Sequence, residues 1–346
     1  MKILLYEFLT AGGWQTLSGN EPAPSSLVRE GAAMLSAIAR DFAKLQHVEV
    51  SFLSDPVYRK AEIAGCNSLD VSRHRGERIA LQKFAAEADW TLVIAPEFDG
   101  ILLDRCESVL AWGGRLLGPS PDVIAIAADK QRTADWLATH GLPVPAGRLV
   151  RGGSLPRDFS YPAVLKPRDG AGSQGLALVK DPEQHQSTAE QRGRELRIEG
   201  FCPGTAASVA LLCGAAGQYA LLPCRQHLST DGTFRYLGGS LPLENELEKR
   251  ASRLAIQAVA TLAKPRGYIG VDLVLGPTPA DDVVIEINPR LTTSYAGLRK
   301  ATTENIAAAM LAVAGDGTSP PPIIWNRRPL RFSPDGKVSY KAVSHV

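Results

Sequence analysis

The chain lacks the cysteine pattern of a disulfide-rich or zinc-binding protein. Its 346 residues contain five cysteines, an odd and widely spaced set, and no Cys-x-x-Cys pair. This argues against a disulfide framework and against a structural zinc site, and it favours a reducing compartment.

The chain also lacks a charge excess and long apolar runs. Its formal net charge is +2, which gives no electrostatic reason to expect nucleic acid or an anionic membrane as a partner. The apolar run at residues 3–6 is broken at Glu7 and is too short for a signal peptide, and no other run approaches a membrane span. We expect a cytoplasmic protein, and the sequence assigns no oligomeric state.

Several common catalytic and nucleotide-binding patterns are missing as well. No Gly-x-Gly-x-x-Gly follows the first expected strand, which disfavours a dehydrogenase, and the Walker pattern is not matched. There is no convincing Ser/His/Asp or Cys/His arrangement for a covalent nucleophile. With 45% apolar and 21% charged residues, the composition is that of an ordinary globular protein of two or three compact units.

One stretch, residues 283–295, carries the most informative chemistry that is present. Residues 283–287 are β-branched except for Glu286, which predicts a buried strand. Because side chains alternate along a strand, Glu286 and Asn288 should share one face. The other face should carry Val283, Ile285 and Ile287. Two hard oxygen donors suit Mg²⁺, although a structural hydrogen-bond network would also explain them.

A second acidic strand should lie beside the first. Asp272 interrupts the apolar run 267–275, and the turn at 276–282 predicts a hairpin with the 283–288 strand. The pairing would bring Asp272 within reach of Glu286 and Asn288, where two carboxylates would repel unless a cation lay between them. Arg290 adds a permanent positive charge just after this set.

The first third of the chain alternates strands with helices, which predicts an open parallel α/β sheet. The expected strands are residues 2–9, 47–53, 90–95 and 115–117, and the expected helices are residues 25–42, 76–87 and 103–112. Ligands bind at the carboxyl ends of such strands, so Glu7, the Gly12-Gly13 turn and Glu97 are candidate substrate contacts. A plain turn explains the two glycines equally well.

The middle of the chain combines lysines with a glycine-rich turn. Residues 122–140 predict one amphipathic helical region that contains Lys130. Strand 162–167 ends at Lys166-Pro167, and the glycine-rich turn 168–175 joins it to strand 176–179. Backbone N–H groups in such a turn can hold phosphates, and a lysine supplies a point charge. A surface lysine and a mobile hairpin are the alternative explanation.

Antiparallel strands and two further helices are expected in the remainder. The predicted strands are residues 196–201, 208–213, 219–224 and 234–237, with Arg225 closing the third, and the predicted helices are residues 245–262 and 304–314. Residues 329–340 predict a basic terminal hairpin, whose charges are most simply solvated.

With these pieces placed, the sequence resembles the ATP-grasp superfamily of carboxylate–amine ligases. The matching motifs are Asp129-Lys130, Val164-Leu165-Lys166-Pro167, Asp169-Gly170-Ala171-Gly172-Ser173, Glu199 with Pro203-Gly204, Gly270-Val271-Asp272 and Glu286-Ile287-Asn288-Pro289-Arg290. Their order and spacing cover about residues 120–315. Tyr6-Glu7-Phe8, Gly12-Gly13 and Ala95-Pro96-Glu97 look like the tyramine–glutamate ligase branch, which works in methanofuran-type C1-carrier biosynthesis.

The resemblance implies an α/β pre-ATP-grasp domain followed by an α+β ATP-grasp fold of two subdomains with an antiparallel sheet. The expected divisions are 1–118 for the first domain, 119–198 and 199–320 for the subdomains, and 321–346 for a basic tail or hairpin. ATP would lie between the subdomains.

The resemblance also implies roles for individual residues. Nucleotide contacts fall on Lys130, Lys166, Asp169, Gly170, Gly172, Ser173 and Glu199. The ligands of Mg²⁺ (or Mn²⁺) would be Asp272, Glu286 and Asn288, and Arg290, with Arg225 as a further candidate, would face the transferred phosphate. Many family members place an acidic ribose ligand shortly after the Pro-Gly turn, but residues 205–208 contain no acid.

The implied reaction is ATP-dependent amide-bond formation between two small molecules, a carboxylate and an amine, through an acyl phosphate. Both substrates should lie near the strand-end candidates and the turn Thr292-Thr293-Ser294, with glutamate and a tyramine-like amine as the first choices. Another amino acid, a peptide or a polyamine would fit the same chemistry. A nucleotide-binding module without catalysis is the alternative from another class, and the intact set of Asp272, Glu286, Asn288 and Arg290 argues against it.

Overall fold

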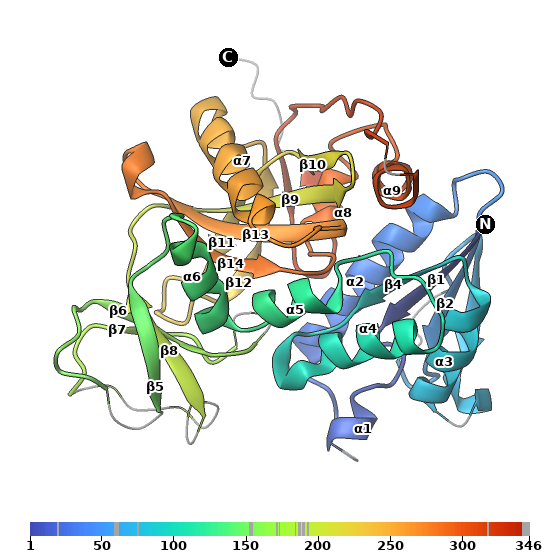
Figure 1. Cartoon of the computed structure of the whole chain (residues 1–346), viewed down its shortest axis with the longest axis horizontal. Helices are drawn as coiled ribbons and strands as arrows, with labels where there is room; N and C mark the ends of the chain where they lie inside the picture. The colour runs from blue at the N-terminus through green and yellow to red at the C-terminus, as the bar shows by residue number, and fades with distance from the viewer. Residues whose placement is uncertain are drawn as a thin grey trace.

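Three β-sheets organise the chain, and each is built mainly from one continuous part of the sequence (Figure 1). The computed structural model describes residues 1–18, 21–58, 62–74, 76–151, 155–170, 172, 174–183, 185, 188, 191, 194–316 and 318–340. Among these residues, none of the helices combines the length and the apolar character needed to cross a membrane.

The N-terminal sheet is the predicted parallel sheet. Its order is β3 (Cys66–Asp70), β2 (Glu49–Ser54), β1 (Lys2–Glu7) and β4 (Trp90–Ile94), and the main helices around it are α2 (Ser25–Phe42), α3 (Glu77–Glu87) and α4 (Ile101–Ala111). Strand β3 was not predicted, because its polar edge sequence carries no clear pattern. The segment expected as strand 115–117 forms only the single bridge between Thr91 and Leu116.

The helical region expected at residues 122–140 is two helices, not one. They are α5 (Pro121–Ala127) and α6 (Lys130–Thr139), and Asp129 separates them. The Asp129 carboxylate accepts hydrogen bonds from the N–H groups of Gln131 and Arg132, both at 3.0 Å, and so caps α6. This break places Lys130 at the first residue of the second helix.

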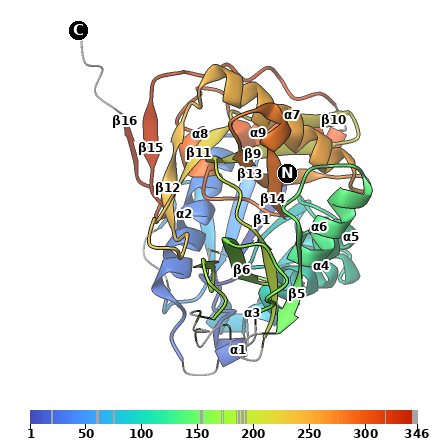
Figure 2. The same ribbon diagram turned by 90° about the vertical axis from the view of Figure 1, so that its left-hand side faces the viewer.

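The small sheet is antiparallel and lies at the lower left of Figure 1, and in Figure 2 its strands β5 and β6 are toward the viewer. Its order is β5 (Gly147–Arg151), β8 (Glu195–Gly200), β6 (Ala163–Pro167) and β7 (Ala177–Val179). The predicted hairpin of β6 and β7 flanks the glycine-rich turn. Edge strand β5 was not predicted, and β8 runs across the division that we expected between residues 198 and 199.

The large sheet is antiparallel throughout and carries the acidic strands. Its order is β14 (Val283–Asn288), β13 (Gly267–Leu275), β9 (Thr205–Gly214), β11 (Cys224–Leu228), β12 (Tyr236–Leu241), β15 (Leu330–Phe332) and β16 (Val338–Tyr340), with β10 (Gly217–Ala220) beside β9. Helix α7 (Asn245–Ala260) packs on β9 and β13, and the short helices α8 (Tyr295–Leu298) and α9 (Ile306–Leu311) follow β14.

Two expectations for this sheet need correction. Residues 219–224 are not one strand, because β10 ends at Ala220 and β11 begins at Cys224, with Pro223 between them. Proline removes a backbone donor and so interrupts a ladder. The predicted terminal hairpin is confirmed, but it is joined to the sheet through β12, and its Leu330 and Phe332 are buried.

The β13–β14 hairpin is confirmed, and its register sets the geometry of the acidic strands. Asp272 pairs with Glu286 and Gly270 with Asn288, but the next pair is Leu273 with Val284. The extra residue in β14 is a bulge, which breaks the alternation that we expected. Val284 and Ile287 therefore enter the core. Val283 and Ile285, predicted on the core face, are only half-buried.

Helix α2 is fastened to the large-sheet unit at its C-terminal end. The Asp41 carboxylate accepts hydrogen bonds from Tyr295 Oη at 3.0 Å and from Arg299 Nε at 2.8 Å. Asn305 Nδ2 donates to the Asp41 carbonyl at 2.7 Å. The N-terminal and large sheets are thus held to each other by a buried polar cluster.

Candidate active site

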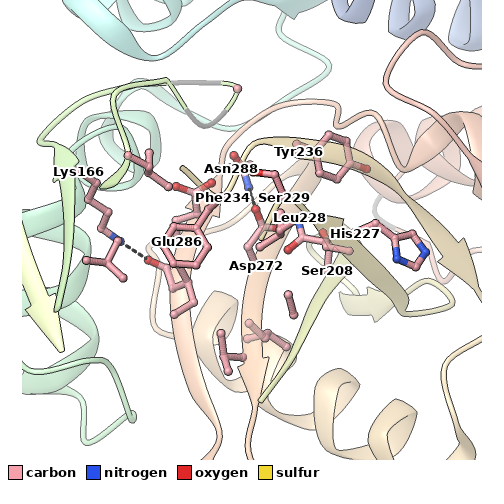
Figure 3. Close-up of a pocket in the computed structure, with 18 of the residues that line it drawn as sticks. Lys166, Ser208, His227, Leu228, Ser229, Phe234, Tyr236, Asp272, Glu286 and Asn288 are labelled. Atoms are coloured by element: carbon pink, nitrogen blue, oxygen red, sulfur yellow. Dashed lines mark hydrogen bonds between the residues drawn. The ribbon is translucent and has the colours of Figure 1, made fainter. Parts of the chain in front are cut away.

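A cavity of about 680 Å³ lies between the small and large sheets, and Glu30 of α2 also lines it. Lys166 reaches into it from β6, while Asp272, Glu286 and Asn288 face it from the large sheet (Figure 3). Because most of the residues singled out by sequence are on its walls, this cavity is the candidate active site.

The three predicted metal ligands come together on β13 and β14. Asn288 Nδ2 donates to Asp272 Oδ2 at 3.2 Å, and the carboxylates of Asp272 and Glu286 are opposite each other in the ladder. Burial, and after it the negative charge of Glu286, raises the pKa of Asp272 to about 7. Two acids in this position need a cation to keep both charged at neutral pH.

The donor set fits a divalent cation of the magnesium type. Asp272 Oδ1 is buried and has no hydrogen-bond partner among the described residues. Nor do these residues gather three His, Cys, Asp or Glu side chains that would enclose a metal on their own. Two carboxylates with one amide match the Mg²⁺ habit of taking few protein ligands and completing its shell with water and phosphate oxygens.

Two lysines line the same cavity. Lys130 Nζ lies 3.5 Å from Glu286 Oε2 and donates to the Gly170 carbonyl at 3.1 Å. Lys166 Nζ lies 2.6 Å from Glu199 Oε1. Burial raises the pKa of Glu286, but the charges of Lys130 and Lys166, with other contacts, outweigh burial and lower it overall. Positive charge is thus concentrated beside one of the two metal-facing acids.

The glycine-rich turn is only partly directed at the cavity. Gly170 and Gly172 line it. Asp169 is directed elsewhere, because its Oδ2 accepts a hydrogen bond from the Asp99 N–H of the N-terminal unit at 2.9 Å. Ser173 lies outside the described residues.

Both predicted catalytic arginines line the cavity, and each has an acidic partner. Arg290 Nε lies 2.8 Å from Glu97 Oε1, and its Nη2 donates to Glu97 Oε2 at 3.1 Å. Glu97 is buried, and the Arg290 side chain is 12% exposed. Arg225 Nη2 lies 3.0 Å from Glu244 Oε1 near the surface. Glu97 therefore reaches the site through Arg290.

The remaining substrate candidates divide into two groups. Thr292, Thr293 and Ser294 line the cavity. Glu7 does not, because its carboxylate accepts hydrogen bonds from the N–H groups of Leu9 at 3.2 Å and Thr10 at 2.7 Å. Burial raises its pKa to about 7.

The Gly12-Gly13 turn also lies outside the cavity lining. A methyl group on Gly12 would lie 2.5 Å from Asp55 Oδ2, and one on Gly13 would lie 2.3 Å from the Phe8 ring. Gly12 has a φ of +81°, which disfavours other residues. Packing within the N-terminal unit therefore explains both glycines.

Several cavity residues were missed by the sequence reasoning. They are Glu30, Phe201, Ser208, His227, Phe234 and Tyr236. Phe201 and Phe234, both in the cavity lining, stack with ring centroids 6.2 Å apart. Glu30 could not be found from sequence, because a single acid on an amphipathic helix predicts a solvent-facing side chain.

Comparison with known proteins gives matches along most of the chain. Residues 48–124 match the pre ATP-grasp 3 domain, and residues 127–294 match the ATP-grasp domain. A tyramine–L-glutamate ligase of Methanocaldococcus fervens is 24% identical over 97% of this chain and 98% of its own length. That of Methanocaldococcus jannaschii is 23% identical over 91% and 89%.

A solved structure has the same fold. The crystal structure of a putative ATP-grasp superfamily protein from Archaeoglobus fulgidus superposes with a TM-score of 0.70 at 23% identity, covering 96% of this chain and 92% of that one. The parallel N-terminal sheet and the two antiparallel sheets are thus the arrangement of that class of protein.

Proposed function

The chain belongs to the ATP-grasp superfamily of carboxylate–amine ligases, and on this premise we propose that it uses ATP and Mg²⁺ to join a small carboxylate to an amine through an acyl phosphate. The observation that carries the proposal is the pair Asp272 and Glu286, two buried acids that face each other in a cavity flanked by lysines. A bound cation would balance the charges of the two acids, and the anionic phosphates of ATP would balance those of the lysines.

The nucleotide is proposed to lie between the small and large sheets. Lys130 and Lys166 would hold its phosphates, with the backbone around Gly170 and Gly172 above them. Glu199 and Phe201, which stacks on Phe234, would contact the adenine ring of the nucleotide. An apolar wall and a buried hydrogen-bond acceptor suit adenine.

The metal is proposed to be held by Asp272, Glu286 and Asn288, and Mg²⁺ or Mn²⁺ both suit these donors. When bound, it would neutralise charge on the phosphates during transfer. The protein's own contribution is to present the donors from a rigid hairpin and to keep Glu286 ionised beside Lys130.

The proposed reaction has two steps. A carboxylate oxygen of the donor attacks the γ-phosphorus, the bond from that phosphorus to ADP breaks, and an acyl phosphate forms. The amine nitrogen then attacks the acyl carbon, the carbon–oxygen bond to phosphate breaks, and the amine loses a proton. Arg290, held by Glu97, is placed to offset the negative charge in both steps.

Glutamate and a tyramine-like amine are the proposed substrates. The support is the similarity to two tyramine–L-glutamate ligases along nearly the whole chain, together with a cavity that extends past the metal donors to Thr293 and Tyr236. Other amino acids, peptides or polyamines are the competing substrates.

ADP release tests the proposal. Purified protein would be incubated with ATP, Mg²⁺, glutamate and a panel of primary amines, and each component would be omitted in turn. We expect ADP to form in proportion to an amide product, and only when donor, amine and metal are all present. If nucleotide binds but no pair of donor and amine raises ADP above background, the protein is a binding module and the proposal fails.

A further inference from the structure

Glu30 is an acidic residue of the cavity to which the proposed nucleotide and metal sites assign no role. It stands on α2 and lines the cavity, where it is within electrostatic range of Arg290 and Tyr236. Its side chain is half-buried. Because Arg290 would face the transferred phosphate, Glu30 lies near the place where the two small substrates would meet.

The carboxylate of Glu30 lacks the partners that other buried acids of the site possess. Glu97 pairs with Arg290, Glu199 with Lys166 and Glu286 with Lys130. Within the described part of the chain, no hydrogen bond or ion pair reaches Glu30. An acid that is partly withdrawn from water and left unpaired favours the arrival of a cation.

The charged and titratable groups that surround Glu30 do not supply that cation. Arg290 and Arg29 act on it only at longer range, since Arg290 is committed to Glu97 and Arg29 donates to Ser25 Oγ at 3.3 Å. Tyr236, on β12, is uncharged because burial raises its pKa far above the usual range. Burial likewise raises the pKa of Glu30, and the two arginines oppose this.

We propose that Glu30 binds the ammonium group of the acceptor amine and takes its proton before the nitrogen attacks. This inference rests on the proposed function. Primary amines arrive protonated at neutral pH, and a protonated nitrogen has no lone pair for attack. One proton moves from the ammonium to the carboxylate, and the free amine forms its bond to the acyl carbon. The carbon–oxygen bond to phosphate then breaks, and the second proton of the nitrogen leaves with the phosphate.

The charge distribution assigns Glu30 to the amine and not to the donor carboxylate. The reacting carboxylate would be repelled by Glu30 and attracted by Arg290, which also lines the cavity. The ammonium group would thus face Glu30 while the carboxylate faces Arg290. The acceptor class is therefore a primary amine that is cationic in solution.

The test compares Glu30→Gln, which keeps the shape and removes the charge, with two kinds of acceptor. With a cationic amine we expect KM for the amine to rise about 30-fold or more, while KM for ATP and glutamate stays within about twofold. Hydroxylamine is largely uncharged at neutral pH, so hydroxamate formation should be retained. Glu30→Asp should recover part of the amine affinity.

Three controls keep the outcomes distinct. Glu107→Gln, an exposed acid on α4 outside the cavity, should behave as wild type, and melting curves should show that both variants fold. The acidic limb of the wild-type kcat/KM profile for the amine should disappear in Glu30→Gln. If the variant loses hydroxamate formation equally, or only KM for glutamate changes, the inference is wrong while the ligase proposal stands. If the wild type releases no ADP with any acceptor, the proposed function itself fails.

Discussion

Asp272 and Glu286 on the large sheet, and Glu7 and Glu97 beside the N-terminal sheet, were all singled out as acids on or just after strands. The two pairs differ in the partners of their carboxylate oxygens. The N-terminal acids have partners, since two backbone N–H groups bind Glu7 and Arg290 binds Glu97. The large-sheet acids face each other, and Asp272 keeps an oxygen without a hydrogen-bond partner among the described residues.

This difference teaches that a buried acid indicates a ligand only where the protein leaves it unsatisfied. Glu7 has a raised pKa as Asp272 does, yet its oxygens are already occupied. Burial alone therefore does not separate a structural acid from a binding one, whereas the partners of each oxygen do.

The largest effect should come from Glu286→Gln. Removing one metal donor should lower kcat/KM by about 100-fold or more, since even indirect support of a metal ligand contributes 10–100-fold. The melting temperature of the metal-free protein should change little, because the lost attraction of Lys130 and Lys166 offsets the relieved repulsion with Asp272. Glu248→Gln is the control, because Glu248, on α7, pairs with Arg327 and is not part of the cavity lining. Wild-type turnover in Glu286→Gln would remove the basis for the metal site.

Glu97→Gln should reduce stability as well as activity. It leaves the buried Arg290 without its counter-charge, and breaking such a pair costs about 3 kcal/mol. The free energy of unfolding, measured by denaturant titration, should fall by about this amount. An unchanged unfolding curve would mean that the charge of Arg290 is balanced without Glu97. The N-terminal acids would then not be held by partners in the way that separates them from Asp272 and Glu286.

Gly31→Ala probes the packing around Glu7. The new methyl group would lie 2.3 Å from Oε1 of Glu7, whose two carboxylate oxygens each accept one backbone N–H. We expect a loss of about 1–3 kcal/mol, although alanine favours a helix over glycine. Gly118→Ala meets no atom within 4 Å and should be neutral. Equal stability of the two variants would show that Glu7 is free to move.

The smallest effect concerns pH. The pKa of Asp272 is about 7 in the folded state and about 4 in an unfolded chain, so the metal-free protein should lose stability as the pH rises from about 4 to about 7. Mg²⁺ should therefore raise the melting temperature by a few degrees above pH 7 and by less at acidic pH. Asp272→Asn should abolish this Mg²⁺ effect, whereas Glu7→Gln should keep it.

The sequence predicted the elements whose pattern is strong and local. The β13–β14 hairpin, the parallel N-terminal sheet and the convergence of Asp272, Glu286 and Asn288 follow from β-branched runs and turn residues. Strands β3 and β5 were missed, because an edge strand with polar, half-exposed residues has no alternation to detect.

Other features depend on contacts that no local pattern encodes. The bulge that turns Ile285 away from the core arises from the pairing of two strands. The position of Glu30 depends on how α2 packs against the large-sheet unit, which is set by distant partners such as Arg299. The Gly12-Gly13 turn predicted a close approach by a substrate, but the groups that lie against it are the side chains of Asp55 and Phe8.

The cluster around Asp41 has a consequence for how substrates enter. It fixes α2, and with it Glu30, to the body that carries Arg290. The small sheet contacts this body through hydrogen bonds such as those from Leu178 N–H to the Gly232 carbonyl at 2.7 Å and from Lys166 Nζ to the Ile285 carbonyl at 3.5 Å. We therefore expect the nucleotide to be admitted by rotation of the small sheet alone, while the spacing between amine and carboxylate sites stays constant through every turnover.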